Sequence, residues 1–158
     1  QCELALALMC ERANERAAFG EHLGHYANVQ DWIAHSRVEI DQARLLVLRT
    51  AWLLDQGSAA DAAATRAQVA AIKVVAARLQ TRVVDRAMQV FGAMGLSPDT
   101  PLAQFWSWGR ALHLMDGPDE VHLRSVARHE LAQARGRMGQ SSDWFTTPEQ
   151  MLAAPRVR

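Results

Sequence analysis

Three carboxylates fall within five positions of one short stretch, Asp116-Gly-Pro-Asp119-Glu120, directly before a helical apolar pattern. A carboxylate in an apolar, closed site can act as a general base, because burial raises its pKa toward the working pH. The same residues also suit a helix start, with Asp116 as the N-cap and Pro118 in the first turn. Asp119 and Glu120 would then favour the positive end of the helix dipole. Taken alone, the stretch favours the capping interpretation, since caps are commoner than catalytic acids.

His22 and His25, beside Glu21, invite comparison with a metal site, but no further ligand follows at a matching spacing. Iron carboxylate bundles carry Glu-x-x-His motifs on inward faces, and Glu21, Glu39 and Glu120 all lack a histidine three residues on. We therefore predict no metal, and a metal carboxylate bundle is kept only as a third option. Three isolated histidines are predicted to be surface or cap residues: His113, His122 and His129.

The composition is that of a folded domain. The 158 residues are 49% hydrophobic and carry a formal net charge of zero, which argues against disorder and against a nucleic-acid interface. No apolar run approaches the roughly 20 residues of a membrane span. Cys2 and Cys10, about 12 Å apart along one predicted helix, are too distant for a disulfide. We therefore expect a reduced, cytoplasmic protein without a signal peptide, and the start on Gln1 inside an amphipathic pattern predicts a piece of a longer chain.

Apolar residues recur at helical spacing along most of the chain, and no segment alternates with the period of a strand. The pattern predicts long helices over about 1–18, 29–55, 60–91 and 118–136, with a shorter one over about 102–112. The predicted fold is all-α, an antiparallel four-helix bundle with a short extra helix before the last long helix. Residues 1–136 would form the bundle and residues 137–158 a loosely held tail. The positions predicted to face inward include Ile33, Ser36, Ile40, Ala43, Val47, Leu54, Val69, Leu79, Val83, Val90, Val121, Val126 and Leu131.

Two further clusters stand apart from the carboxylate stretch: Arg16-x-x-Phe19-Gly20 and Gln89-Val-Phe-Gly92-Ala-Met-Gly95. Each alone is an ordinary helix end. Between and after them come Gln30, Ala43-Arg44, Lys73, Asp116-Gly-Pro-Asp-Glu-Val-His122 and Ala127-Arg128. In this order and at these separations, the motifs over residues 1 to about 136 resemble the C-terminal helical domain of the acyl-CoA dehydrogenases.

The resemblance implies an FAD flavoprotein, usually a tetramer, built from an N-terminal helical domain, a middle β-domain and a C-terminal four-helix bundle. This chain would be about the last third. In the family, a carboxylate before the last helix removes the α-proton of an acyl thioester while the β-hydride passes to the flavin. The commonest motif there is Tyr-Glu-Gly-Thr, which aligns Met115 with the Tyr and Asp116 with the catalytic Glu. Asp116 is therefore the candidate base, as in family branches that carry Asp.

The resemblance also implies FAD-binding residues. Arg16 corresponds to an arginine that reaches the pyrophosphate of a neighbouring subunit's FAD, and Phe19 would pack near the same cofactor. Gln89, Gly92 and Gly95 match the helix end that meets the ADP part across the dimer interface, although the family's second glycine is Ala93 here.

Two more positions carry over from the family's FAD contacts. Pro118 and Glu120 stand where the family often has Thr and Gln, and neither keeps the hydrogen-bond donor.

The resulting hypothesis is an acyl-CoA dehydrogenase that performs α,β-dehydrogenation of an acyl-CoA, with this chain inactive when isolated. We expect a homo-oligomer, dimer or tetramer, formed through the bundle. The electron acceptor, an electron-transfer flavoprotein or oxygen, and the acyl-chain length are not encoded in these residues. The alternative is a non-catalytic helical bundle used for assembly, in which Asp116 is only a cap.

Overall fold

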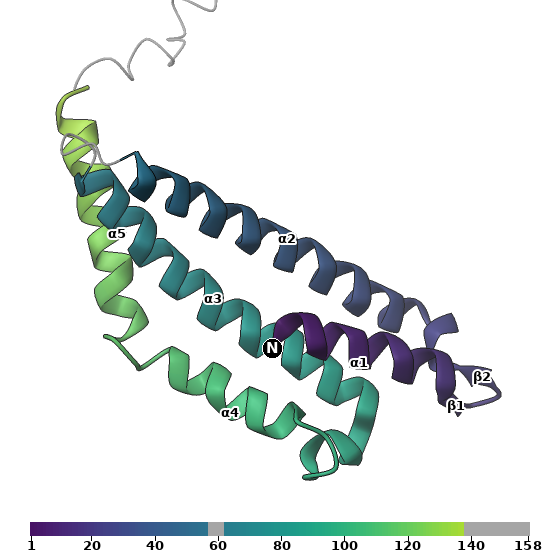
Figure 1. The fold of residues 1–158 in the computed structure, drawn as a ribbon. Coiled ribbons are helices and arrows are strands. Elements are labelled where there is room, and N and C mark those ends of the chain that lie inside the picture. Colours follow the sequence, from purple (N-terminus) through teal and green to yellow (C-terminus); the bar gives the residue numbers. More distant parts are fainter. Residues whose placement is uncertain (57–61, 138–158) are drawn as a thin grey trace, which may run out of the picture.

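The computed structural model describes residues 1–56 and 62–137, and these form an almost entirely helical structure (Figure 1). The predicted tail over 137–158 therefore lies almost wholly outside the described residues. The elements are α1 (Cys2–Glu15), β1 (Ala17–Ala18), β2 (Glu21–His22), η1 (Leu23–His25), α2 (Ala27–Asp55), α3 (Ala62–Phe91), η3 (Gly92–Leu96), α4 (Leu102–Leu112) and α5 (Asp119–Arg135).

The all-α prediction is confirmed, with α4 as the short helix before the last long one. One detail is wrong: the first helix ends at Glu15 and not near residue 18, and residues 17–22 form a small antiparallel hairpin. Each strand has only two residues, which is too short to show an alternating pattern. The turn between them depends on Phe19 and Gly20, whose φ angles are 54° and 92°.

Helix α3 is the centre of the fold, since it packs against α1, α2, α4, α5 and η3. Figure 1 shows it lying between α2 on one side and α4 on the other. Alanines and valines suit this position, because small side chains let several helices approach one axis. The buried residues of α3 therefore form a wide band that includes Ala67, Ala70, Val74, Ala77, Leu79, Val83, Val84, Ala87 and Val90.

The core is completed by residues of α1, α2 and α4. Met9 in α1 and Leu102 in α4 are fully buried against it, and Ile40 and Ala43 of α2 belong to the same cluster. The predicted inward face of α2 is therefore confirmed up to Ala43.

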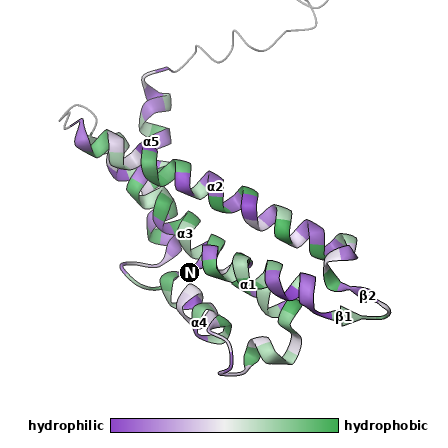
Figure 2. Cartoon of the chain, turned by 45° about the vertical axis from the view of Figure 1, so that its right-hand side comes forward, coloured by the Kyte–Doolittle hydropathy of each residue, from purple (hydrophilic) through white to green (hydrophobic). Residues whose placement is uncertain are grey.

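Several residues predicted to be inward are exposed: Val47, Leu54, Val69, Val121 and Leu131. Hydrophobic residues continue along α2 toward its C-terminal end (Figure 2). Helix α1, however, lies beside the N-terminal part of α2 (Figure 1), and α5 packs on α3. These segments do have apolar faces, but no other described residues cover these exposed side chains.

Candidate functional site

The hairpin after α1 presents two of the predicted cofactor residues. Arg16 follows the last residue of α1 with an extended backbone, and its N–H donates to the Arg12 carbonyl at 2.9 Å. Phe19 lies at the hairpin tip, 99% exposed and in the left-handed region. A non-glycine residue with positive φ is held there at an energetic cost, which often marks a functional position.

A groove of about 650 Å³ lies between this hairpin and the C-terminal end of α3. Its lining includes Arg16 and Phe19 from the hairpin and Gln89 and Gly92 from the end of α3. The fold therefore brings together four residues that the sequence separates by about seventy positions. Gly95 is buried in η3 just beyond, where a Cβ would come within 2.9 Å of the Met88 backbone. A glycine at 95 is thus required for the close approach of η3 to α3.

The groove is basic. Arg12 joins Arg16 in its wall, and the Arg12 guanidinium stacks over the Phe91 ring at 5.5 Å from the ring centroid. Arg12 Nε is buried and has no hydrogen-bond partner among the described residues. None of the described lining residues is acidic. Two guanidinium groups without a competing carboxylate suit a phosphate ligand.

Sequence reasoning missed Arg12. Its signal was a second arginine four positions before Arg16, in the last turn of the first helix.

The loop between α4 and α5 holds Asp116 in an unusual backbone conformation. Asp116 and Gly117 have φ angles of 53° and 99°, so two successive residues lie in the positive-φ region. The carbonyl of Asp116 is 3.0 Å from His122 Nε2, while its side chain is exposed. Helix α5 starts only at Asp119, and Pro118 precedes it with an extended backbone.

The capping interpretation of Asp116 is wrong, because α5 has no side-chain cap hydrogen bond. Pro118 occupies the N-cap position and not the first helical turn, so Asp116 lies too far from the first free N–H groups. What looked like a cap in the sequence is instead a strained loop residue.

Asp119 lies at the other end of this loop and is buried. Its carboxylate accepts a hydrogen bond from Lys73 Nζ at 2.9 Å, and its second oxygen is 2.6 Å from His113 Nδ1. Burial raises the pKa of Asp119, but the hydrogen bonds from Lys73 and His113 outweigh this and leave the pKa below its usual value.

His113 was predicted to be a surface or cap residue, and this is wrong, because its ring is largely buried against Asp119 and Thr81. Lys73 belonged to the motif pattern but had no assigned role. The missed signal is a lysine in the apolar pattern of the central helix, since a largely buried lysine needs an acidic partner.

Residues 1–131 match the sequence profile of the acyl-CoA dehydrogenase C-terminal domain. The chain belongs to this family. The protein named "Probable acyl-CoA dehydrogenase FadE2" of Mycobacterium tuberculosis is 53% identical over 133 residues, which cover 84% of this chain and 32% of that protein.

Two further relatives agree. Acyl-CoA dehydrogenase family member 10 of Mus musculus is 52% identical over 129 residues, or 82% of this chain and 12% of that protein. The structure of butyryl-CoA dehydrogenase from Megasphaera elsdenii is similar with a TM-score of 0.75 at 28% identity, covering 82% of this chain and 33% of that one. The chain thus spans a third or less of the length of these relatives.

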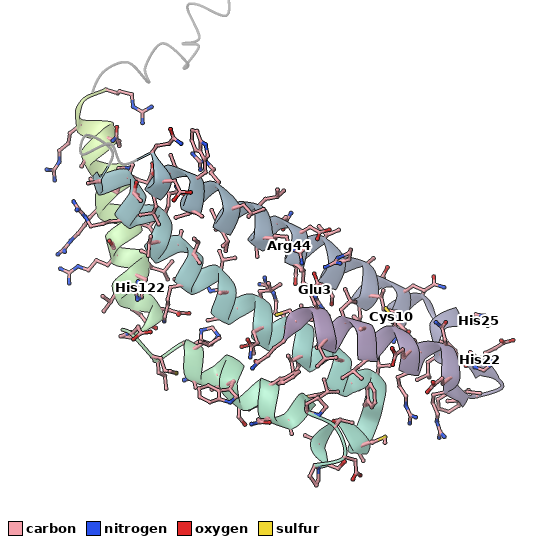
Figure 3. All side chains as sticks on the ribbon, viewed as in Figure 1. Glu3, Cys10, His22, His25, Arg44 and His122 are labelled. Atoms are coloured by element: carbon pink, nitrogen blue, oxygen red, sulfur yellow. The ribbon has the colours of Figure 1, made fainter. Side chains whose placement is uncertain are left out.

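This acyl-CoA dehydrogenase domain holds its two sets of candidate residues far apart. Lys73, near the Asp116 loop, and Gln89, in the basic groove, are sixteen residues apart on α3, or about 24 Å at the helical rise. Figure 3 shows the same separation, with His122 beside the Asp116 loop and His22 and His25 at the hairpin. Each set of residues would therefore contact a ligand at a separate surface of the domain.

The remaining candidate residues lie beside the Asp116 loop. Glu120 is exposed and lines a pocket of about 280 Å³ with Arg110 and His113, and Pro118 is exposed at the start of α5.

Within residues 1–56 and 62–137, no three metal-ligating side chains come together, and His25 instead pairs with Glu21 at 2.8 Å. No helix in the described part of the chain is long and apolar enough to cross a membrane.

Proposed function

We propose that this chain is the C-terminal bundle of an FAD-dependent acyl-CoA dehydrogenase. The full reaction would remove the α-proton of an acyl-CoA thioester with a carboxylate base and the β-hydrogen as a hydride. The observation that carries the proposal is the shared groove of Arg16, Phe19, Gln89 and Gly92. Residues 1–136 would act as one unit, with 137–158 as an appended tail.

The residues of the basic groove fit FAD. Arg16 and Arg12 can bind the pyrophosphate, whose paired charges suit planar guanidinium groups. Phe19 offers an exposed ring for packing, and Gly92 lets the α3 end approach a ligand through its backbone. Gly95 would act indirectly, by letting η3 pack closely on α3. When bound, FAD would accept the hydride. We propose that this groove serves the FAD of a neighbouring subunit.

Asp116 is the proposed base. It lies on a loop whose backbone is bent by two successive positive φ angles, at Asp116 and Gly117. Its side chain is exposed among the described residues, so the closed apolar surroundings that favour proton abstraction would come from the domain that covers the flavin. Pro118 and Glu120 would lie near the FAD bound by the same subunit, where Glu120 cannot contact a phosphate favourably.

The test uses full-length protein, or this chain co-expressed with the flavin-covering domain. Asp116→Asn should keep its FAD but lose flavin bleaching by a panel of acyl-CoAs at least roughly 100-fold, because an amide cannot take the proton. Asp85→Asn, an exposed α3 position, is the control for removing one charge. Bleaching of Asp116→Asn at the wild-type rate would show that the base lies elsewhere.

The alternative, an assembly module, is favoured by the exposed apolar residues Leu45, Leu48 and Trp52 of α2. It predicts that the chain self-associates without FAD and that Asp116→Asn leaves this self-association unchanged. The two functions are compatible in a homo-oligomeric dehydrogenase, dimer or tetramer.

We further propose that the enzyme is cytoplasmic and passes electrons to an electron-transfer flavoprotein or to oxygen. The isolated chain would neither retain FAD nor show flavin bleaching.

A further inference from the structure

Lys73 is a largely buried charged residue of α3, the helix against which α5 packs. Its side chain is only 15% exposed, and that of its partner Asp119 is 12% exposed. Burial of a charged pair is costly, so such a pair often stabilises a fold no more than apolar residues of the same size would. The proposed proton abstraction uses neither residue directly. Their position beside the Asp116 loop suggests a role in holding that loop.

Lys73 connects both ends of the loop to one point on α3. Its Nζ donates to the carbonyl of His113, the residue that follows α4, at 3.1 Å. It also donates to the carboxylate of Asp119, the first residue of α5, at 2.9 Å. The two ends also bind each other: the Asp119 N–H donates to the His113 carbonyl at 3.2 Å, and His113 Nδ1 lies 2.6 Å from the Asp119 carboxylate. The loop of residues 114–118 is thereby held together at its two ends.

The loop itself offers little to fix Asp116. The Asp116 side chain makes no hydrogen bond among the described residues, and its carbonyl is bonded to His122 Nε2. The direction of the carboxylate therefore depends on the strained backbone at φ 53°. Such a backbone persists only where the surroundings hold it, and here these are the closed loop ends together with the His122 ring bonded to the Asp116 carbonyl.

We propose that Lys73 is a positioning residue for Asp116, acting through Asp119 and His113 to fix the loop that carries the base. This rests on the proposed function of Asp116. Misplacement of a reacting group by about 1 Å can cost about 100-fold in rate. Loss of Lys73 should therefore lower the rate of proton abstraction more than it lowers substrate or FAD binding.

The test compares Lys73→Met with Arg86→Met in full-length protein. Arg86 lies on the same helix and pairs with Glu39 at 2.9 Å, with side chains 19% and 21% exposed, so its loss matches the disruption without touching the loop. For Lys73→Met we expect flavin bleaching per bound FAD to fall at least roughly tenfold, with KM and FAD content within about threefold of wild type. Arg86→Met should bleach at the wild-type rate. Equal bleaching by the two variants would overturn the proposal.

Two further measurements keep the outcomes distinct. If Lys73→Met does not fold, Asp119→Asn serves instead, since it keeps the volume and weakens the same contacts. Hydrogen exchange of the amides of residues 114–117 should become faster in Lys73→Met and stay unchanged in Arg86→Met. Unchanged exchange in both variants would refute the proposal that Lys73 holds the loop. A wild-type rate in Asp116→Asn would refute the proposed base while leaving this exchange result to decide whether Lys73 holds the loop.

Discussion

Asp116 and Asp119 are three residues apart, yet their surroundings differ completely. Asp116 is exposed on a bent loop, whereas Asp119 is buried between a lysine and a histidine. One position suits a group that must reach a ligand, and the other suits a group that organises its neighbours. The fold thus places two neighbouring carboxylates of the sequence cluster in different surroundings, which suit different roles.

The buried carboxylate makes a prediction for pH dependence. Because its hydrogen bonds hold the pKa of Asp119 below the usual value in the folded state, Asp119 stabilises the fold above its unfolded pKa. That contribution is lost as the pH falls through the folded pKa. Asp119→Asn should lower the free energy of unfolding by about 2 kcal/mol at neutral pH and flatten its decline in acid, as measured by urea denaturation across pH.

Asp116→Asn provides the comparison for this experiment, since its exposed carboxylate has no hydrogen bond among the described residues. Its free energy of unfolding at neutral pH should stay close to that of wild type. If the free energy of unfolding of Asp119→Asn declined in acid as steeply as that of wild type, the buried ion pair would not contribute to the pH dependence of stability.

At the scale of elements, the hairpin after α1 depends on a few contacts with the rest of the bundle. Tyr26 donates a hydrogen bond from its hydroxyl to the Ala18 carbonyl at 2.7 Å, and the Leu23 N–H donates to the Arg16 carbonyl at 2.8 Å. These bonds hold the segment that carries Arg16 and Phe19 against η1 and the start of α2, whose residues Leu23 and Tyr26 also line the groove. The shape of the basic groove therefore depends on them.

Tyr26→Phe should loosen this hairpin. The loss of one partly buried hydrogen bond costs about 1 kcal/mol, which corresponds to an FAD dissociation constant raised about fivefold in full-length protein. Thr50→Val is the matched control, because it removes a hydroxyl bond to the Leu46 carbonyl at 2.8 Å, away from the groove. Equal FAD affinity in both variants would show that the Tyr26 hydrogen bond to the hairpin does not contribute to FAD binding.

At the scale of the whole molecule, the bundle has a long apolar surface that no described helix covers. Leu45, Leu48 and Trp52 are spaced three and four residues apart on α2 and are 66%, 58% and 59% exposed. Contiguous apolar surface of this kind is uncommon on a monomer and indicates an interface.

Self-association through this surface can be measured directly. Leu48→Glu should raise the dissociation constant of the oligomer at least roughly tenfold, because a buried carboxylate would be left without a partner. Sedimentation or light scattering would detect the shift to monomer. Gln42→Glu, also on α2 and exposed, should leave the oligomer intact, and a wild-type chain that is monomeric at high concentration would contradict the prediction.

The sequence by itself determined the helical architecture and the family. Apolar spacing sets which side of a helix is hydrophobic, so the long helices and the buried positions Ile40, Val83 and Val90 could be predicted locally. The motifs around Arg16, Gln89 and Asp116 could be read in the same way, because each is a short run of residue types.

Only the tertiary structure decided which residues meet. The contact between Lys73 and Asp119 joins positions 46 apart, and the basic groove joins a hairpin to the far end of α3. Periodicity also could not show that Val47 and Leu54 are exposed, since it records an apolar face and not what covers it. The loop of Asp116 looked like a helix cap because capping depends on where the first turn begins, and that is set by the attachment of Asp119 to Lys73 and His113.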